Sequence, residues 1–344
     1  MKVKWCGLTS TERKFNGGGP QGATFGIWEY LAQSNSNAEC VEPENRFKFV
    51  DDLSVLEKIN LLLIGLASFD CHTSVPSDLP THNQFIPSEH LKSQEYLTTI
   101  KEWTEKQRMI LNQKKTKAMI FNFTEDYQFS TRLNLNGENL EVVSETKLLG
   151  VMITDDLKWD VNTDYLVKKA NARMQLLRKV TSFTCSKEDK REIYILYIRS
   201  ILEQSSVVWH SSLTKQNEED LERVQKSAVK LINGDNIENY EEALMQANLK
   251  SLKTRREELC KNFAEKCIKS DNLRAKSLFP EKDKIHQMAT RNEENFKVNH
   301  ANTGRLMKSS IPYMQRILNL ERNVEKKRKI SYQNNVDRKR RKPG

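Results

Sequence analysis

The chain has 344 residues but no aspartate before Asp51. It also lacks a long apolar run: the longest candidate, residues 59–69, is interrupted by Asn60 and Gly65 and is shorter than the ~20 residues of a membrane-spanning helix. The first residues lack the apolar segment of a secretory signal. We therefore expect an intracellular protein that does not enter a membrane.

Cysteine is scattered, and no Cys-x-x-Cys pair occurs, which favours reduced thiols over a disulfide framework or a zinc knuckle. Cys71 and His72, with His82 and His90, are a conceivable ligand set, but their irregular spacing favours ordinary loop residues. The glycine-rich residues 17–22 are not followed by Gly-Lys-Ser or Gly-Lys-Thr. The sequence therefore has no P-loop, and no dinucleotide-binding fingerprint is present either.

Positive charge is concentrated at the C-terminal end. The whole chain has 56 lysines and arginines against 46 acidic residues, a net charge of +10. Residues 325–344 hold nine of these cations and two acids, a net +7, which leaves +3 for the first 324 residues. Such a tail is typical of a nuclear-import signal or of a nonspecific phosphate-binding arm, and a solvated disordered end fits the composition equally well.

Two neighbouring acids, Asp51 and Asp52, end a short apolar run that begins at residue 46. This pattern predicts a strand–turn–strand hairpin with the acids at its tip. Carboxylates held on rigid backbone are what a pair of divalent ions about 3.5–4 Å apart requires. The Gly/Pro/Gln loop upstream would let backbone approach a nucleotide closely. An Asp pair also occurs in turns without any function, because Asp hydrogen-bonds its own backbone there.

The apolar periodicity predicts mixed structure first and helices later. We expect a helix over residues 91–109, a hairpin over 129–143 turned by Asn136-Gly137, and a strand over 147–153. Beyond Trp159 three apolar stripes predict helices: Leu166, Ala170, Met174 and Leu177; Tyr194, Ile198, Ile201 and Leu202; Leu221, Val224, Ala228 and Leu231. Arg223, Lys226 and Lys230 lie opposite the third stripe, as a solvated face or as nucleic-acid contacts.

Four short blocks in this order resemble the palm of reverse transcriptases from non-LTR retrotransposons of the jockey-like kind. They are Gly-Gly-Pro-Gln-Gly at 18–22, Phe-Val-Asp-Asp at 49–52, Leu-Asn-x-x-Lys-Thr at 111–116 and Lys-Leu-Leu-Gly at 147–150. The helical part is similar to the region that follows the palm in that family. The resemblance covers roughly residues 15–320.

The resemblance implies an α+β fold: a partial polymerase palm, which is an antiparallel sheet with helices, then an all-helical thumb-like region and a basic tail. It divides the chain into a palm (residues 1–155), a thumb or connection region (156–270), a weakly ordered region (271–324) and the tail (325–344). The partners implied are an RNA template, a DNA primer and a deoxynucleoside triphosphate. The tail suggests a nuclear location.

The resemblance also implies a role for individual residues of the palm. Asp51 and Asp52 match the catalytic pair that binds Mg²⁺ in a two-metal site, with Asp51 the more important ligand. Pro20, Gln21 and Gly22 match the loop beside the incoming nucleotide and the template.

The two later blocks carry the remaining implied roles. Lys115 matches a lysine near the triphosphate that could protonate the leaving pyrophosphate. Leu148, Leu149 and Gly150 match the primer grip. The helices after Trp159 match the thumb.

The absent aspartate bears on activity. The family has a further metal-binding aspartate upstream of the Pro-Gln-Gly loop, within a fingers segment, whereas residues 1–50 contain none. Losing one bridging carboxylate should weaken metal binding and transition-state stabilisation. We expect an RNA-directed DNA polymerase (nucleotidyltransferase) fragment of a mobile element that is inactive alone. Two alternatives are a non-catalytic nucleic-acid-binding protein derived from a retrotransposon and a helical interaction protein whose Asp pair merely ends a turn.

Overall fold

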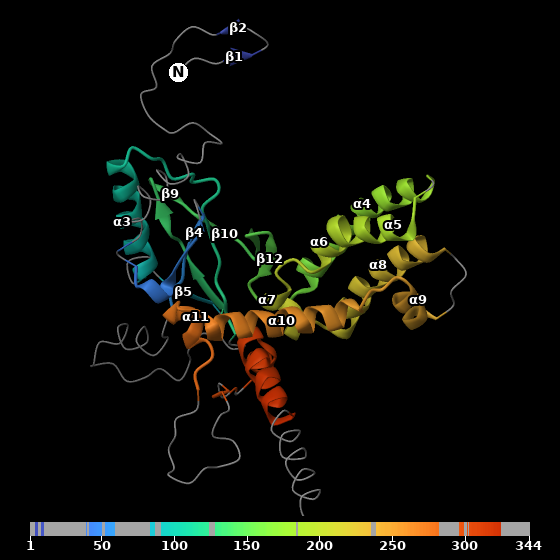
Figure 1. The fold of residues 1–344 in the computed structure, drawn as a ribbon. Helices are drawn as coiled ribbons and strands as arrows, with labels where there is room; N and C mark the ends of the chain where they lie inside the picture. The colour runs from blue at the N-terminus through green and yellow to red at the C-terminus, as the bar shows by residue number, and fades with distance from the viewer. Residues whose placement is uncertain are drawn as a thin grey trace, which may run out of the picture. The chain divides into compact units, whose positions relative to one another are not determined.

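The computed structural model describes residues 4–5, 8–9, 39, 41–49, 52–58, 83–86, 91–123, 128–183, 185–234, 239–281, 296–298, 301 and 303–324. The fold is mixed α+β, and it divides into two compact units, residues 1–144 and 145–344 (Figure 1). Each unit is described by itself below.

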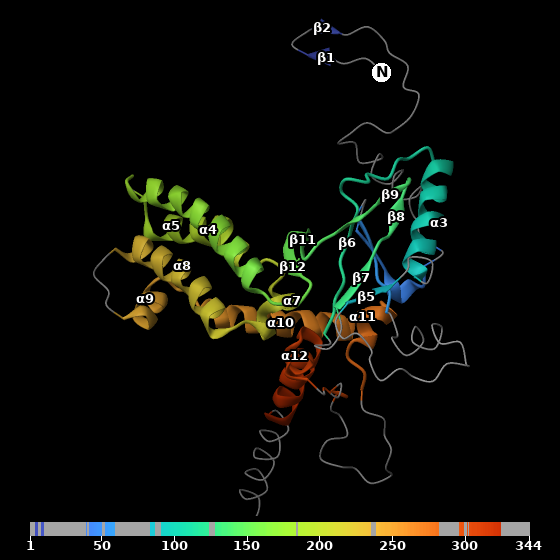
Figure 2. The same cartoon turned by 180° about the vertical axis from the view of Figure 1, so that it is seen from behind.

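In its described part, the first unit contains short strands and the long helix α3 (Figures 1 and 2). Three strand pairs are antiparallel: β1 (Lys4–Trp5) with β2 (Leu8–Thr9), β3 (Arg46–Phe49) with β4 (Asp52–Val55), and β8 (Asn134–Leu135) with β9 (Glu138–Asn139). Two are parallel: β5 (Asn83–Ile86) with β7 (Gln128–Thr131), and β6 (Lys117–Ala118) with β10 (Glu141–Val142). A 3-10 turn, η1 (Pro43–Asn45), precedes β3, and the helix is α3 (Lys92–Lys106).

Two predictions for this unit are confirmed. The expected helix over residues 91–109 is α3, and the hairpin β8–β9 turns at Asn136 and Gly137, whose φ values of 56° and 85° suit a two-residue turn. The hairpin is shorter than predicted. The strands on either side of β8–β9 do not lengthen the hairpin, because β7 pairs with β5 and β10 pairs with β6.

The second unit is mainly helical. It begins with the antiparallel hairpin of β11 (Glu145–Leu148) and β12 (Val151–Thr154). The helices are α4 (Asp160–Thr181), α5 (Lys187–Ile193), the π-helical segment η3 (Tyr194–Arg199), α6 (Ser200–Leu202), α7 (Ser206–Trp209), the 3-10 turn η4 (His210–Ser212), α8 (Lys215–Asn233), α9 (Tyr240–Gln246), α10 (Leu252–Lys269), α11 (Leu273–Ser277) and α12 (Gly304–Lys308). Residues 310–324 are also helical.

One strand prediction in this unit is wrong. Residues 147–153 were expected to form a single strand, but Leu149 and Gly150 have φ values of 48° and 86° and reverse the chain between β11 and β12. Hairpin β11–β12 packs against α4, and it therefore belongs to the helical unit and not to the unit of the preceding strands. The assignment of palm and thumb stays a prediction.

The core of the helical unit follows the predicted stripes closely. All four residues of the first stripe and all four of the second are buried in one cluster, which extends to Val151 of β12. On α8, Leu221, Val224 and Ala228 are buried as expected, whereas Leu231 is only half-buried and Val229 and Ile232 join the core instead. Gly234 ends α8 with a φ of 84°, a backbone conformation that glycine adopts readily at the end of a helix.

The weak order expected for residues 271–324 does not hold in the described part of that range. Phe279, Phe296, Met314 and Leu318 are buried together with Cys260 and Cys267 of α10. The apolar face of α10 needs a cover, which is supplied by Met314 and Leu318 of the helical residues 310–324 together with the non-helical Phe279 and Phe296. Both cysteines are buried free thiols, in agreement with the expectation of reduced cysteines.

The basic tail, residues 325–344, lies outside the described residues. No helix of the described chain has both the length and the apolar character to span a membrane.

Candidate functional site

The hairpin β3–β4 carries the predicted acid pair. Phe49 pairs with Asp52 across the hairpin, so only positions 50 and 51 separate the two paired strands in the sequence. Asp52 is exposed at the start of β4. The predicted strands on both sides of the acid pair are therefore confirmed. Asp51 itself lies outside the described residues, as do Pro20, Gln21 and Gly22.

The hairpin is held against α3 by apolar side chains. Leu53 and Val55 of β4 pack against a small buried cluster that contains Tyr96 and Ile100 of α3 together with Val41. Leu53 lies next to Asp52 in the sequence, so this packing fixes the backbone from which the Asp52 carboxylate projects. Rigid backbone is what a metal-binding carboxylate requires.

A second contact fastens the end of the hairpin to the same helix. The Glu57 carboxylate, just beyond β4, accepts hydrogen bonds from the backbone N–H groups of Lys92 (3.1 Å) and Ser93 (2.9 Å). These N–H groups lie in the first turn of α3, whose N-cap residue Leu91 gives no side-chain hydrogen bond. A carboxylate is favoured at this position by the helix dipole. The sequence did not reveal this cap, since Glu57 is 35 residues from Lys92.

Glu42 adds a third connection between α3 and the chain before the hairpin. The Tyr96 hydroxyl donates a hydrogen bond of 2.5 Å to the Glu42 carboxylate. This bond to the charged acceptor raises the pKa of Tyr96 to about 12, and the same bond lowers the pKa of Glu42. At neutral pH Tyr96 therefore stays protonated and Glu42 stays ionised, as this hydrogen bond requires.

The predicted Mg²⁺ site is represented in the described chain by Asp52 alone. A carboxylate oxygen is a suitable ligand for Mg²⁺, and exposure leaves Asp52 accessible. No three His, Cys, Asp or Glu side chains in the described residues group as metal ligands. The magnesium assignment thus stays a prediction that depends on Asp51.

The Leu-Asn-x-x-Lys-Thr block forms a turn that stabilises itself. The Asn112 side-chain oxygen accepts from the backbone N–H of Lys115 (3.2 Å), and the Asn112 carbonyl accepts from the Thr116 hydroxyl (3.0 Å). Lys115 is exposed at this turn. The Asn and Thr of the block thus have local structural roles, and the lysine is presented to solvent.

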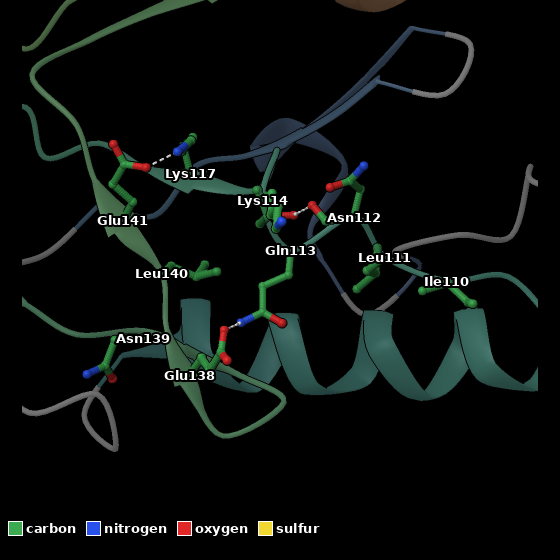
Figure 3. A pocket seen from close by; sticks show the side chains of 11 residues that line it. Ile110, Leu111, Asn112, Gln113, Lys114, Lys117, Glu138, Asn139, Leu140 and Glu141 are labelled. Atoms are coloured by element: carbon green, nitrogen blue, oxygen red, sulfur yellow. Dashed lines mark hydrogen bonds and ion pairs between the residues drawn. The ribbon is translucent and has the colours of Figure 1, made fainter.

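A pocket of about 720 Å³ lies beside this turn (Figure 3). Its walls are residues 110–114 and 116–117 on one side and residues 138–141 on the other. Gln113 reaches across it and donates a hydrogen bond of 2.6 Å to Glu138, and Lys117 forms an ion pair with Glu141. Lys115 does not line it. With two carboxylates in its wall and Lys117 already paired, the pocket is poorly suited to a triphosphate.

The predicted primer-grip residues form the tip of hairpin β11–β12. Leu149 is half exposed, and Gly150 is packed so closely that a Cβ built on it would lie 2.3 Å from Nε2 of Gln204. The φ of 86° favours glycine at position 150, and a Cβ there would also displace the end of the Gln204 side chain. The sequence identified the glycine but not its neighbour.

Unusual backbone surrounds that contact. The π-helical segment Tyr194–Arg199 precedes Gln204, and Ser205 follows it with a φ of 51°, in the left-handed region. The Trp209 indole N–H donates to the Gln204 carbonyl at 3.0 Å and holds this junction. Wide helical turns and left-handed non-glycine residues are frequent at functional sites.

A buried charge in the helical unit was not foreseen. Arg256 of α10 has no exposed surface; its Nε lies 3.3 Å from Nδ1 of His210, and its guanidinium lies 5.8 Å from the centre of the Trp209 ring. Both terminal nitrogens of Arg256 lack a hydrogen-bond partner in the described structure. Burial, reinforced by the Arg256 charge, lowers the pKa of His210 to about 4.

Comparison with known proteins found no family model, curated protein or solved structure that matches this chain.

Proposed function

We propose that this chain is part of an RNA-directed DNA polymerase of the non-LTR retrotransposon kind. In this proposal residues 1–155 belong to the palm, which includes hairpin β11–β12, and residues 156–270 belong to the thumb or connection region. The observation that carries it is the hairpin β3–β4, whose short connection contains Asp51 and ends at the exposed Asp52. The packing of β4 on α3 and the Glu57 cap support a rigid placement of these acids.

The proposed reaction joins a primer 3′-hydroxyl to the α-phosphate of a deoxynucleoside triphosphate, with pyrophosphate as the leaving group. Asp51 and Asp52 would hold Mg²⁺, which neutralises charge on the phosphates and favours ionisation of the attacking hydroxyl. Lys115, exposed at its turn, would lie near the triphosphate and give a proton to the leaving pyrophosphate. Leu148, Leu149 and Gly150 would support the primer strand.

The proposal includes a dependence on a further carboxylate. Residues 1–50 contain no aspartate, so within this sequence Asp51 is the first candidate ligand of its type. A two-metal centre with one bridging ligand missing should be slow by a factor of at least ~10²–10³, the loss typical of one electrostatic contact. We therefore expect polymerisation only when a fingers segment supplies the third carboxylate.

Primer extension on an RNA template tests the proposal. The purified chain, with Mg²⁺, should extend a DNA primer poorly alone and measurably after addition of a fingers segment from a jockey-like reverse transcriptase. Asp51→Asn and Asp52→Asn should each abolish the restored activity. Asp271→Asn, which changes an exposed acid of the helical unit, is the matched control and should leave it intact. Efficient extension by the chain alone would disprove the need for a third carboxylate.

A second candidate is nucleic-acid binding without chemistry, and the surface of α4 favours it. Five cations of α4 are exposed, and none forms an ion pair with a described residue: Lys168, Lys169, Arg173, Arg178 and Lys179. Such a surface can neutralise phosphates whether or not the palm is active. RNA binding without extension, even with the added fingers segment, would select this candidate.

A further inference from the structure

Two lysines and a tyrosine gather where hairpin β11–β12 meets α4. The Lys147 ammonium donates a hydrogen bond of 2.7 Å to the Tyr165 hydroxyl and lies 4.8 Å from the centre of the Tyr165 ring. The Lys169 ammonium lies 5.7 Å from the same ring centre. Residues distant in sequence thus bring two positive charges to one aromatic side chain.

Neither lysine is neutralised by the described part of the chain. Lys147 and Lys169 are exposed, and no described carboxylate forms an ion pair with either of them. Both positive charges lie near the Tyr165 ring, and an anion that contacts both ammonium groups would gain the attraction of each. The positive surroundings also lower the pKa of the Tyr165 hydroxyl, mainly through its hydrogen bond with Lys147.

The three side chains offer several hydrogen-bond donors around one aromatic ring. Each lysine has three N–H donors, and Lys147 uses one of them on Tyr165. The Tyr165 oxygen accepts that bond, so its own O–H can still donate. Oxyanions accept several such bonds at once, and charged donors make the strongest ones.

The cluster continues along one side of α4. Tyr165, Lys169 and Arg173 are spaced four residues apart, so their Cβ atoms follow one another at about 5–6 Å along the helix surface. Arg173 is exposed, while Leu166 and Ala170 are buried in the core. A row of cations on one helix side suits a ligand that carries a repeated negative charge.

We propose that Lys147, Tyr165 and Lys169 bind one backbone phosphate of a nucleic-acid strand, which continues past Arg173 along α4. The site deepens the proposed function and rests on it. Contacts to phosphate carry no base information, so binding here is independent of sequence. The resemblance to reverse transcriptases gives no role to any of these three side chains.

The test measures binding of the full chain to a fluorescent single-stranded RNA over a series of KCl concentrations. Lys147→Gln and Lys169→Gln should each weaken binding about tenfold, the loss of one charge-assisted hydrogen bond. Each should also lower the magnitude of the salt slope by about 0.7, the value for one phosphate contact on a single strand. Tyr165→Phe removes a donor but no charge, so affinity should fall while the slope stays constant.

Four controls separate the site from general effects. Lys187→Gln removes an exposed cation of α5 that has no ion pair in the described structure, and binding should change little. Lys147→Arg and Lys169→Arg should retain binding, and circular dichroism should match the parent chain for every variant. Unlabelled RNA should displace the probe at concentrations where inorganic phosphate at equal ionic strength does not.

The outcomes distinguish this site from the proposed function. If Lys147→Gln and Lys169→Gln behave like Lys187→Gln, the site is wrong while the proposed function stands. If the full chain binds no nucleic acid at low salt, both are wrong. If inorganic phosphate competes as well as RNA, the cluster binds a free phosphate ion, and the assignment to a strand is wrong.

Discussion

Gly150 lies against Gln204, at the point where the tip of hairpin β11–β12 meets the chain just after α6. A Cβ on residue 150 would come within 2.3 Å of the Gln204 side chain. The hairpin is therefore fixed to the helical unit at its tip as well as through Val151, which belongs to the core. This double attachment makes the position of Leu149 and Gly150 depend on the helices.

Replacing Gly150 with alanine should lower the free energy of unfolding by roughly 1–3 kcal/mol, because alanine disfavours a φ of 86° and its Cβ meets Gln204. Gly137→Ala is the matched control. Gly137 has a φ of 85° at the same position of a two-residue turn but no neighbour within 4 Å of a Cβ. In denaturant titrations, Gln204→Ala should recover part of the loss in the Gly150→Ala background. The close contact would be contradicted if both glycine variants lost the same free energy of unfolding and Gln204→Ala recovered none of it in the Gly150→Ala background.

Removing the Glu57 carboxylate should loosen the start of α3. Glu57→Ala leaves the N–H groups of Lys92 and Ser93 without their acceptor, so we expect a loss of about 1 kcal/mol, as for an N-cap. Hydrogen exchange of these two amides should become faster. Glu102→Ala removes an exposed acid from the middle of the same helix and should leave them unchanged. Unchanged amide protection in Glu57→Ala would show that the carboxylate is not the cap.

His210 should make stability depend on pH. Its pKa in the folded protein is lowered to about 4 from an ordinary value of 6.5, so between these values the unfolded chain binds the additional proton. The free energy of unfolding should therefore be highest above pH 6.5 and fall by roughly 3 kcal/mol as the pH drops to 4. Denaturation of the parent chain and of His210→Asn at both pH values measures the difference. An equal pH dependence in the two proteins would assign the effect to other groups.

Two neighbouring arginines should respond in opposite ways to replacement by methionine. Arg256 is buried with two unpartnered nitrogens, so Arg256→Met should leave the free energy of unfolding unchanged or raise it, and it should raise the pKa of His210. Arg255 donates two hydrogen bonds to Glu203, at 3.0 and 3.2 Å, and Arg255→Met should destabilise the protein. Thermal unfolding and an NMR titration of His210 measure both effects. A large loss for Arg256→Met would mean that its charge is compensated.

Deleting the basic tail should change the salt dependence of RNA binding. The tail contains nine cations, and each phosphate that it neutralises contributes about 0.7 to the slope on single-stranded RNA. We expect the magnitude of the slope of log K against log salt concentration to decrease by several units in a chain that ends at residue 324. Replacing the nine cations with glutamine at full length is the control for chain length. An unchanged slope in both proteins would place the contacts on the folded units.

The features that the sequence predicted well are local. The stripe on α4 repeats every three or four residues, and all four of its members are buried. Asn136-Gly137 makes its turn because both residues accept positive φ, which neighbours in the sequence suffice to specify. The antiparallel pairing of β3 with β4 likewise follows from residues 46–55 alone.

The features that it missed depend on contacts between distant residues. The Glu57 cap joins residues 35 apart, and the cluster at Tyr165 depends on Lys147 approaching across the start of α4. The strand predicted over residues 147–153 failed because apolar residues on both sides of Leu149-Gly150 hid a turn. These contacts and this turn become visible only in the folded structure.

The π-helical segment Tyr194–Arg199 gives one continuous helical run two separate attachments. At its first residue, Tyr194 donates a hydrogen bond to Gln225 of α8; beyond its last residue, Glu203 accepts from Arg255 of α10. A π-turn spaces its hydrogen bonds one residue wider than an α-turn, so it offsets the two halves of the run by one residue, roughly 100° of rotation. Insertions or deletions between Tyr194 and Arg199 would thus turn one attachment away from its partner, even where every side chain was conserved.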